Sequence, residues 1–110
     1  MKTEFQGKKI GRFYILDENK EVVLCEQFEQ HVFWFEENNA CIACDTAGDA
    51  MVSTVFIGQD MGDSASNPLV FETRLFINGE DQNELVQFYE SWDEAHAGHN
   101  AMVKKHLATH

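Results

Sequence analysis

In an extended chain from residue 69 to residue 77, Leu69, Phe71, Leu75 and Ile77 share one face and Glu72 and Arg74 lie on the other. A period of two is that of a β-strand buried on one face. Two earlier stretches, residues 40–46 and 51–57, are separated by a short turn, and the second is rich in the β-branched and aromatic residues that favour strands. These three segments predict an antiparallel arrangement in which 51–57 and 69–77 are neighbouring strands.

Two predicted turns indicate further strands. Asn78-Gly79 predicts a tight hairpin turn, because both positions accept positive φ, and the chain should return as a strand around residues 85–89. Near the start, residues 10–16 and 22–25 are short apolar runs separated by polar residues, which predicts an N-terminal β-hairpin.

The pattern becomes helical between residues 26 and 37. Phe28, Val32 and Phe35 recur at i, i+4 and i+7, so we expect them to form the buried face of a helix. The helix should end at Asn38-Asn39, because asparagine tolerates the left-handed conformation common at helix exits.

A second helix is predicted from Trp92 to about Leu107. Ser91 and Glu94 have the spacing of a capping box, in which each side chain satisfies a backbone N–H at the helix start. Its inner side should pack on the sheet and carries Trp92, Ala95, His99, Met102, Val103, His106 and Leu107. The expected fold class is α+β: one domain over residues 1–110 with an N-terminal β-hairpin, a helix, an antiparallel sheet of about four further strands, and a C-terminal helix packed on one sheet face.

The net charge of the chain limits the classes of partner that we expect it to bind. The 110 residues include 8 Lys plus Arg and 19 Asp plus Glu, a formal net charge of −11. Direct nucleic-acid binding is disfavoured, because its affinity comes largely from Lys and Arg. The start lacks the apolar run of a signal peptide and no stretch is long enough to cross a bilayer, so we expect a cytoplasmic protein that does not enter a membrane. An odd count of three cysteines favours reduced thiols.

Two groups of residues are weak candidates for metal chemistry. Cys41 and Cys44 form a lone Cys-x-x-Cys, but in a strand their odd separation should send the side chains to opposite faces, which favours a structural role. His96 and His99 lie one helical turn apart and could share a metal, yet no further ligand series surrounds them. We expect His99 and His106 to be packed residues, and no cofactor.

The longest predicted loop and the strand after it are the candidate binding region. Residues 58–68 combine glycines, small polar residues and the single proline. Asp60 and Asp63 in this loop lack the ligand pattern of a calcium site and should be solvated. Glu72 and Arg74 should share one face of the following strand as a polar patch.

Several stretches resemble a family of small bacteriophage and prophage proteins without an assigned function. The similarity extends from residue 13 to residue 103, and its most specific part is Val-Ser-Thr-Val-Phe at 52–56, then Phe-Glu-Thr at 71–73 and a helix containing Ala-Gly-His at 97–99. The Cys-x-x-Cys segment is not part of the family pattern. The resemblance implies a phage origin and no activity, and its matching positions of interest are Thr54, Asp60, Phe71, Glu72, Thr73 and His99.

The leading functional hypothesis is a non-enzymatic accessory protein that binds a host or phage protein in the infected cell's cytoplasm. Its candidate binding residues are Thr54, Asp60, Asp63, Glu72, Thr73 and Arg74. Two alternatives remain: an acidic inhibitor that occupies the nucleic-acid groove of a host defence nuclease, and a small metal-dependent enzyme that uses His96 and His99.

Overall fold

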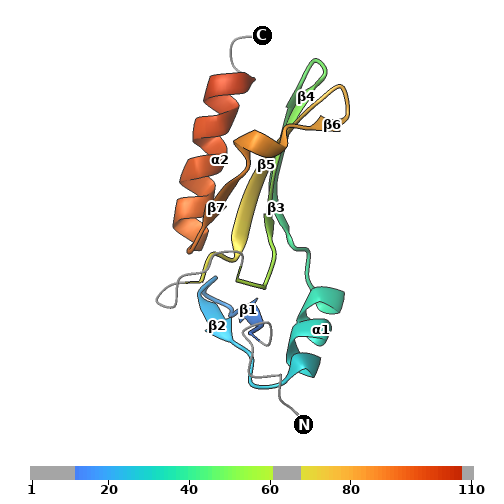
Figure 1. The fold of residues 1–110 in the computed structure, drawn as a ribbon. Coiled ribbons are helices and arrows are strands. Elements are labelled where there is room, and N and C mark those ends of the chain that lie inside the picture. The colour runs from blue at the N-terminus through green and yellow to red at the C-terminus, as the bar shows by residue number, and fades with distance from the viewer. Residues whose placement is uncertain (1–11, 61–67, 108–110) are drawn as a thin grey trace.

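The computed structural model describes residues 12–60 and 68–107, and their fold is α+β, as the sequence predicts. A five-stranded antiparallel sheet carries one helix along one face, and a two-stranded hairpin and a short helix lie together at one end of the sheet (Figure 1). In chain order the elements are β1 (Tyr14–Leu16), β2 (Val22–Leu24), α1 (Phe28–Glu37), β3 (Cys41–Ala47), β4 (Ala50–Phe56), β5 (Phe71–Ile77), β6 (Glu80–Asp81), the 3-10 helix η3 (Asn83–Leu85), β7 (Gln87–Tyr89) and α2 (Trp92–His106).

The sheet has the order β3-β4-β5-β6, with β7 also paired to β5. β4 and β5 are antiparallel neighbours, as predicted, with Thr54 opposite Thr73 and Ser53 opposite Arg74. Residues of β4 alternate strictly between buried and half-buried positions. The buried side faces α2, and the other side, which carries Ser53 and Arg74, forms the open face of the sheet.

Tight turns join the strands at one end of the sheet. Asn78 and Gly79 have φ of 55° and 80°, so the Asn-Gly pair forms the expected hairpin turn between β5 and β6. Gly48, with φ of 60°, begins the turn between β3 and β4. The returning strand predicted after Asn78-Gly79 is split, because η3 interrupts it between β6 and β7.

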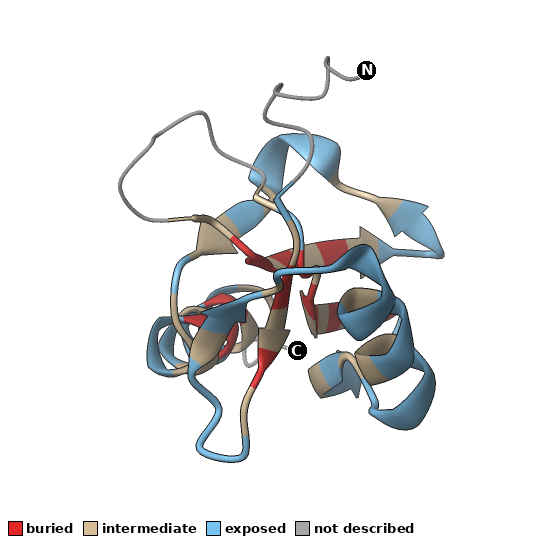
Figure 2. Cartoon of the chain, turned by 90° about the horizontal axis from the view of Figure 1, so that it is seen from below, coloured by how far each residue is buried: buried red, intermediate tan, exposed pale blue. Residues whose placement is uncertain are grey.

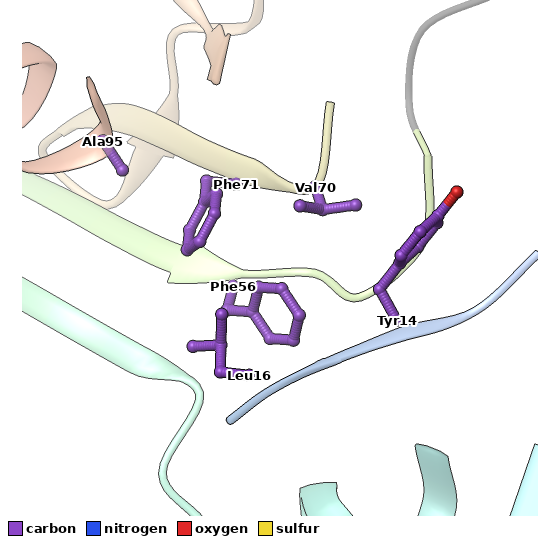
Figure 3. Close-up of a cluster of buried hydrophobic side chains, with 6 residues drawn as sticks. All are labelled: Tyr14, Leu16, Phe56, Val70, Phe71 and Ala95. Carbon is purple, nitrogen blue, oxygen red and sulfur yellow. The ribbon is translucent and has the colours of Figure 1, made fainter. Parts of the chain in front are cut away.

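The core consists of two apolar clusters. The first joins the hairpin, the sheet and α2 through Tyr14, Leu16, Phe56, Val70, Phe71 and Ala95 (Figure 3). The second lies between the sheet and the second half of α2 and contains Ala50, Val52, Leu75, Met102 and Leu107. Buried positions gather at the centre of the molecule and exposed positions surround them (Figure 2).

The residues of α2 have the expected roles. The Ser91 hydroxyl accepts a hydrogen bond from the Glu94 N–H at 3.1 Å and caps the helix. The Glu94 carboxylate lies 3.4 Å from the backbone nitrogen of Glu90. Acidic residues stand in the first turn and basic ones in the last, as the helix dipole favours. Ala95, His99 and Met102 are buried against the sheet.

α1 differs from the sequence prediction. Its inward side carries His31, Trp34 and Phe35, whereas Phe28 and Val32 are exposed. The exit prediction is also wrong in conformation, because Asn38 is extended, with φ of −132° and ψ of 157°. The helix has no buried residue, since only the end of the sheet and the small hairpin lie against it. Trp34 and Phe35 each contact the Phe56 ring.

Gly98 allows α2 to approach β7 closely. A Cβ atom added at Gly98 would overlap the phenol ring of Tyr89. We expect Gly98→Ala to lower the free energy of unfolding by about 1–3 kcal/mol, the usual cost of overpacking. The control Ala97→Ser, at the exposed neighbouring position, should change it by less than about 0.5 kcal/mol.

Chemical denaturation of both variants measures these costs. Repeating Gly98→Ala in a Tyr89→Leu background should reduce its cost, because the ring that the methyl group would strike is gone. An equal cost in both backgrounds would refute the close-approach explanation.

Candidate functional site

The most polar region of the core is centred on His99, whose side chain is 2% exposed. Its Nε2 lies 2.7 Å from Asp45 Oδ2, and its Nδ1 lies 2.7 Å from Thr54 Oγ1. α2 is thereby bonded both to the edge strand β3 and to the central strand β4. The prediction that His99 packs on the sheet is confirmed, and the sequence did not reveal Asp45 as its partner.

The hydrogen bonds continue across the sheet. Thr54 Oγ1 is 2.5 Å from Thr73 Oγ1 on β5, and Thr73 is hydrogen-bonded to the Tyr89 hydroxyl on β7. Tyr89, Thr73, Thr54, His99 and Asp45 are thus linked in one continuous series of hydrogen bonds. We call these five residues the polar chain.

The polar chain contains the acid, histidine and hydroxyl groups found in nucleophilic triads. Thr54 and Thr73 are both 0% exposed, however, beneath α2. A substrate carbonyl cannot reach Thr54 Oγ1 in this conformation, so the arrangement acts as a structural bond between helix and sheet. Thr54 and Thr73, two of the predicted binding residues, therefore lie away from the surface.

Arg74 occupies the open face of the sheet as predicted, together with Glu72. Its Nε donates to Glu72 Oε2 at 2.8 Å, and its Nη1 donates to Asp81 Oδ2 at 2.7 Å and to Asn83 Oδ1 at 3.1 Å. Hydrogen bonding to Glu72 raises the pKa of Arg74 further above its usual value. The guanidinium is thus already held by neighbouring side chains.

Of the two predicted loop aspartates, Asp60 lies within the described residues. Asp60 is half-buried, and its Oδ1 accepts a hydrogen bond from Leu69 N at 2.9 Å, so it is more than a solvated loop residue. Asp63 lies outside the described residues.

The histidines of α2 do not form a shared site. Both ring nitrogens of His99 are hydrogen-bonded, to Asp45 and to Thr54, whereas the His96 ring lies tilted against the Trp92 ring, 4.9 Å between ring centroids. Within residues 12–60 and 68–107, no group of three or more His, Cys, Asp or Glu side chains could hold a metal ion.

The positions of Cys41 and Cys44 on β3 differ from the prediction that they point to opposite faces. A bulge lies between Cys41 and Ala43, so Cys41 pairs with Val55 and Cys44 with Ser53. Val55 and Ser53 are two residues apart on β4, and both cysteines consequently lie on the open face, where they are exposed. The expectation of opposite faces assumed a regular strand.

A surface that the sequence reasoning missed lies on β2 and α1. Seven large apolar side chains are exposed among the described residues, and five of these fall between residues 23 and 33. They are Val23 at 38%, Leu24 at 49%, Phe28 at 55%, Val32 at 39% and Phe33 at 65% exposure. We call these five the β2–α1 surface. The sequence signal that could have revealed this surface is a short hairpin followed by a helix rich in aromatic residues, because so small a hairpin cannot bury all of them.

No family model, curated protein or solved structure matches the chain. In the part of the chain that the structure describes, no helix is both long and apolar enough to cross a lipid bilayer.

Replacing His99 tests the polar chain. His99→Ala should lower the free energy of unfolding by about 2–4 kcal/mol, because it leaves a cavity and removes the hydrogen bonds to Thr54 and Asp45. Asp45→Ala should cost only about 0.5–1.5 kcal/mol, since the Asp45 side chain is 56% exposed and water can replace it. Urea denaturation at neutral pH measures both, and a larger loss for Asp45→Ala would contradict the assignment.

Tyr89 should make stability depend on alkaline pH. Burial raises its pKa above the ordinary value near 10, and the hydrogen bond with Thr73 only partly opposes that change. The folded state therefore holds the phenol proton more tightly than the unfolded state does. This contribution is present below about pH 10 and is lost as the pH rises through the folded pKa. The stability difference between wild type and Tyr89→Phe should shrink over that range, and a constant difference would rule the effect out.

Proposed function

We propose that this chain is a non-enzymatic protein-binding module that makes contact through the β2–α1 surface. The observation that carries the proposal is the exposure of five large apolar side chains between residues 23 and 33. Exposed apolar area costs roughly 25 cal/mol per Å² relative to burial, so large apolar side chains exposed on two consecutive elements favour a protein contact site.

The charge distribution favours a protein partner over other ligands. Between residues 21 and 37 the chain has five Glu and no Lys or Arg. Phosphate backbones and anionic lipid headgroups would be repelled by such a segment. A protein surface can combine apolar contact with complementary charge, so it suits this region best.

The positions of Thr54 and Arg74 favour a binding role over a catalytic one. The candidate nucleophile Thr54 is 0% exposed, and the Arg74 guanidinium is held by Glu72 and Asp81. Neither group is free to act on a substrate in the described conformation. We therefore assign a structural, fold-stabilising role to the polar chain.

The open face of the sheet around Glu72 and Arg74 is a second contact region, as proposed from the sequence. Its polar groups already satisfy one another, so burying them would give a smaller gain than burying the β2–α1 surface. The resemblance to phage proteins suggests that the partner is a host or phage protein in the cytoplasm of an infected bacterium.

Paired variants separate the two regions. Leu24→Ser with Phe33→Ser removes apolar area from the β2–α1 surface and should weaken partner binding at least tenfold, since central apolar contacts dominate most interfaces. Cys44→Lys with Thr46→Lys changes exposed positions on the open face and should leave affinity within about twofold. Partners are captured from infected-host lysate with wild type, identified, purified and titrated against each folded variant by calorimetry.

Each of the other outcomes would overturn part of the proposal. Loss of binding only in the Cys44→Lys, Thr46→Lys variant would transfer the site to the open face. Unchanged affinity in both variants would refute binding through either region. Reproducible turnover of a small substrate by metal-free wild type would overturn the non-enzymatic assignment.

A further inference from the structure

We propose that the outward face of α1 docks a cationic protein segment, one in which Lys or Arg residues flank apolar anchors. The inference rests on the proposed function, because it names the chemistry of the partner that meets the β2–α1 surface. Phe33 is the centre of the face, and carboxylates surround it.

Helical geometry places three glutamates around Phe33. Glu29, Glu36 and Glu37 stand at i−4, i+3 and i+4 from it, the spacings at which side chains become neighbours on a helix surface. All three are exposed, and Phe33 is the most exposed large apolar side chain of the described residues, at 65%. The side chains of His31, Trp34 and Phe35 point the other way, toward the hairpin and the end of the sheet.

Among the described residues, no Lys or Arg forms an ion pair with these carboxylates. Where the structure describes side chains, the ion pairs involve Arg74 with Glu72 and Asp81, and His99 with Asp45. None reaches α1. The segment from residue 21 to residue 37 has five Glu and no Lys or Arg, so it contains no positive charge of its own.

The end of α1 has the wrong charge for a helix terminus. Glu36 and Glu37 stand in the last turn, and no basic residue stands there with them. Negative charges near a helix C-terminus are unfavourable, because the helix dipole is negative at that end. An incoming Lys or Arg would interact favourably with both carboxylates and with the dipole, so α1 should become more stable on binding.

The aromatic ring identifies the form of the cationic partner. A surface that imitates nucleic acid needs regularly placed charges and gains nothing from a large exposed ring among them. Phe33 can instead bury an apolar anchor and also receive a cation over its face. A second copy of this chain is the wrong occupant, since it would bring the same carboxylates and a further charge of −11.

Synthetic peptides test the charge preference directly. The probes are two fluorescent 18-residue peptides with the same helical Leu pattern, one with Lys and the other with Glu at every remaining position, together with a Lys-Ser peptide lacking Leu. At about 0.15 M salt, where distant charges are screened, wild type should bind the Leu-Lys peptide at least tenfold more tightly than either of the others. Anisotropy titration measures the affinities.

Charge-matched variants then locate the site. Glu29→Gln, Glu36→Gln and Glu37→Gln together should weaken Leu-Lys binding roughly tenfold, while helix content, checked by circular dichroism, is retained or increased. The control combines Glu18→Gln, Glu84→Gln and Glu90→Gln, exposed positions with the same change in net charge, and should stay within about twofold. Phe33→Ser should weaken binding with no change in charge.

The outcomes separate this inference from the function on which it rests. Equal losses in the two triple variants would mean that binding follows net charge, and the α1 site would be wrong. Equal affinity for Leu-Lys and Leu-Glu peptides would remove the cation preference and leave apolar docking intact. If no peptide binds but Leu24→Ser with Phe33→Ser still loses its captured partner, the inference fails and the proposed function stands. If that variant also keeps its partner, both fail.

Discussion

The bond between His99 and its two partners is the interaction on which the arrangement of this domain depends. A buried imidazole without hydrogen-bond partners would cost several kcal/mol. Here Thr54 and Asp45, on adjacent strands, satisfy both ring nitrogens at 2.7 Å. These bonds favour the observed register of α2 on the sheet, because a shift by one turn would separate the His99 ring from both Thr54 and Asp45.

That register determines how the remaining surfaces are covered. α2 lies over β4, β5 and β7, and its inner residues complete the two apolar clusters. The open face of the sheet satisfies itself instead, by the ion pairs of Arg74 with Glu72 and Asp81. At the end of the sheet, the rings of Trp34 and Phe35 pack on the Phe56 ring. These contacts hold α1 against the sheet, but no residue of α1 is buried.

Exposure is consequently uneven across the domain. The sheet and α2 place their apolar side chains inside, whereas β2 and α1 leave Leu24, Phe28 and Phe33 at the surface. In a domain this small, one helix and one hairpin cannot cover every apolar side. The uncovered side also carries Glu29, Glu36 and Glu37, which form no ion pair among the described residues, so apolar exposure and negative charge coincide in the region proposed to bind a partner.

The sequence alone determined the α+β class, the Asn78-Gly79 hairpin and the span and inner side of α2, because local period, turn chemistry and capping specify them. It could not determine which strands would supply partners for His99, since Asp45 is 54 residues away. It misplaced Phe28 and Val32 for the same kind of reason. Helical spacing shows which residues share a side, but only the tertiary structure decides whether anything lies against it. The β3 bulge likewise placed Cys41 and Cys44 on one face, because pairing with β4, and not the count of residues between them, set their directions.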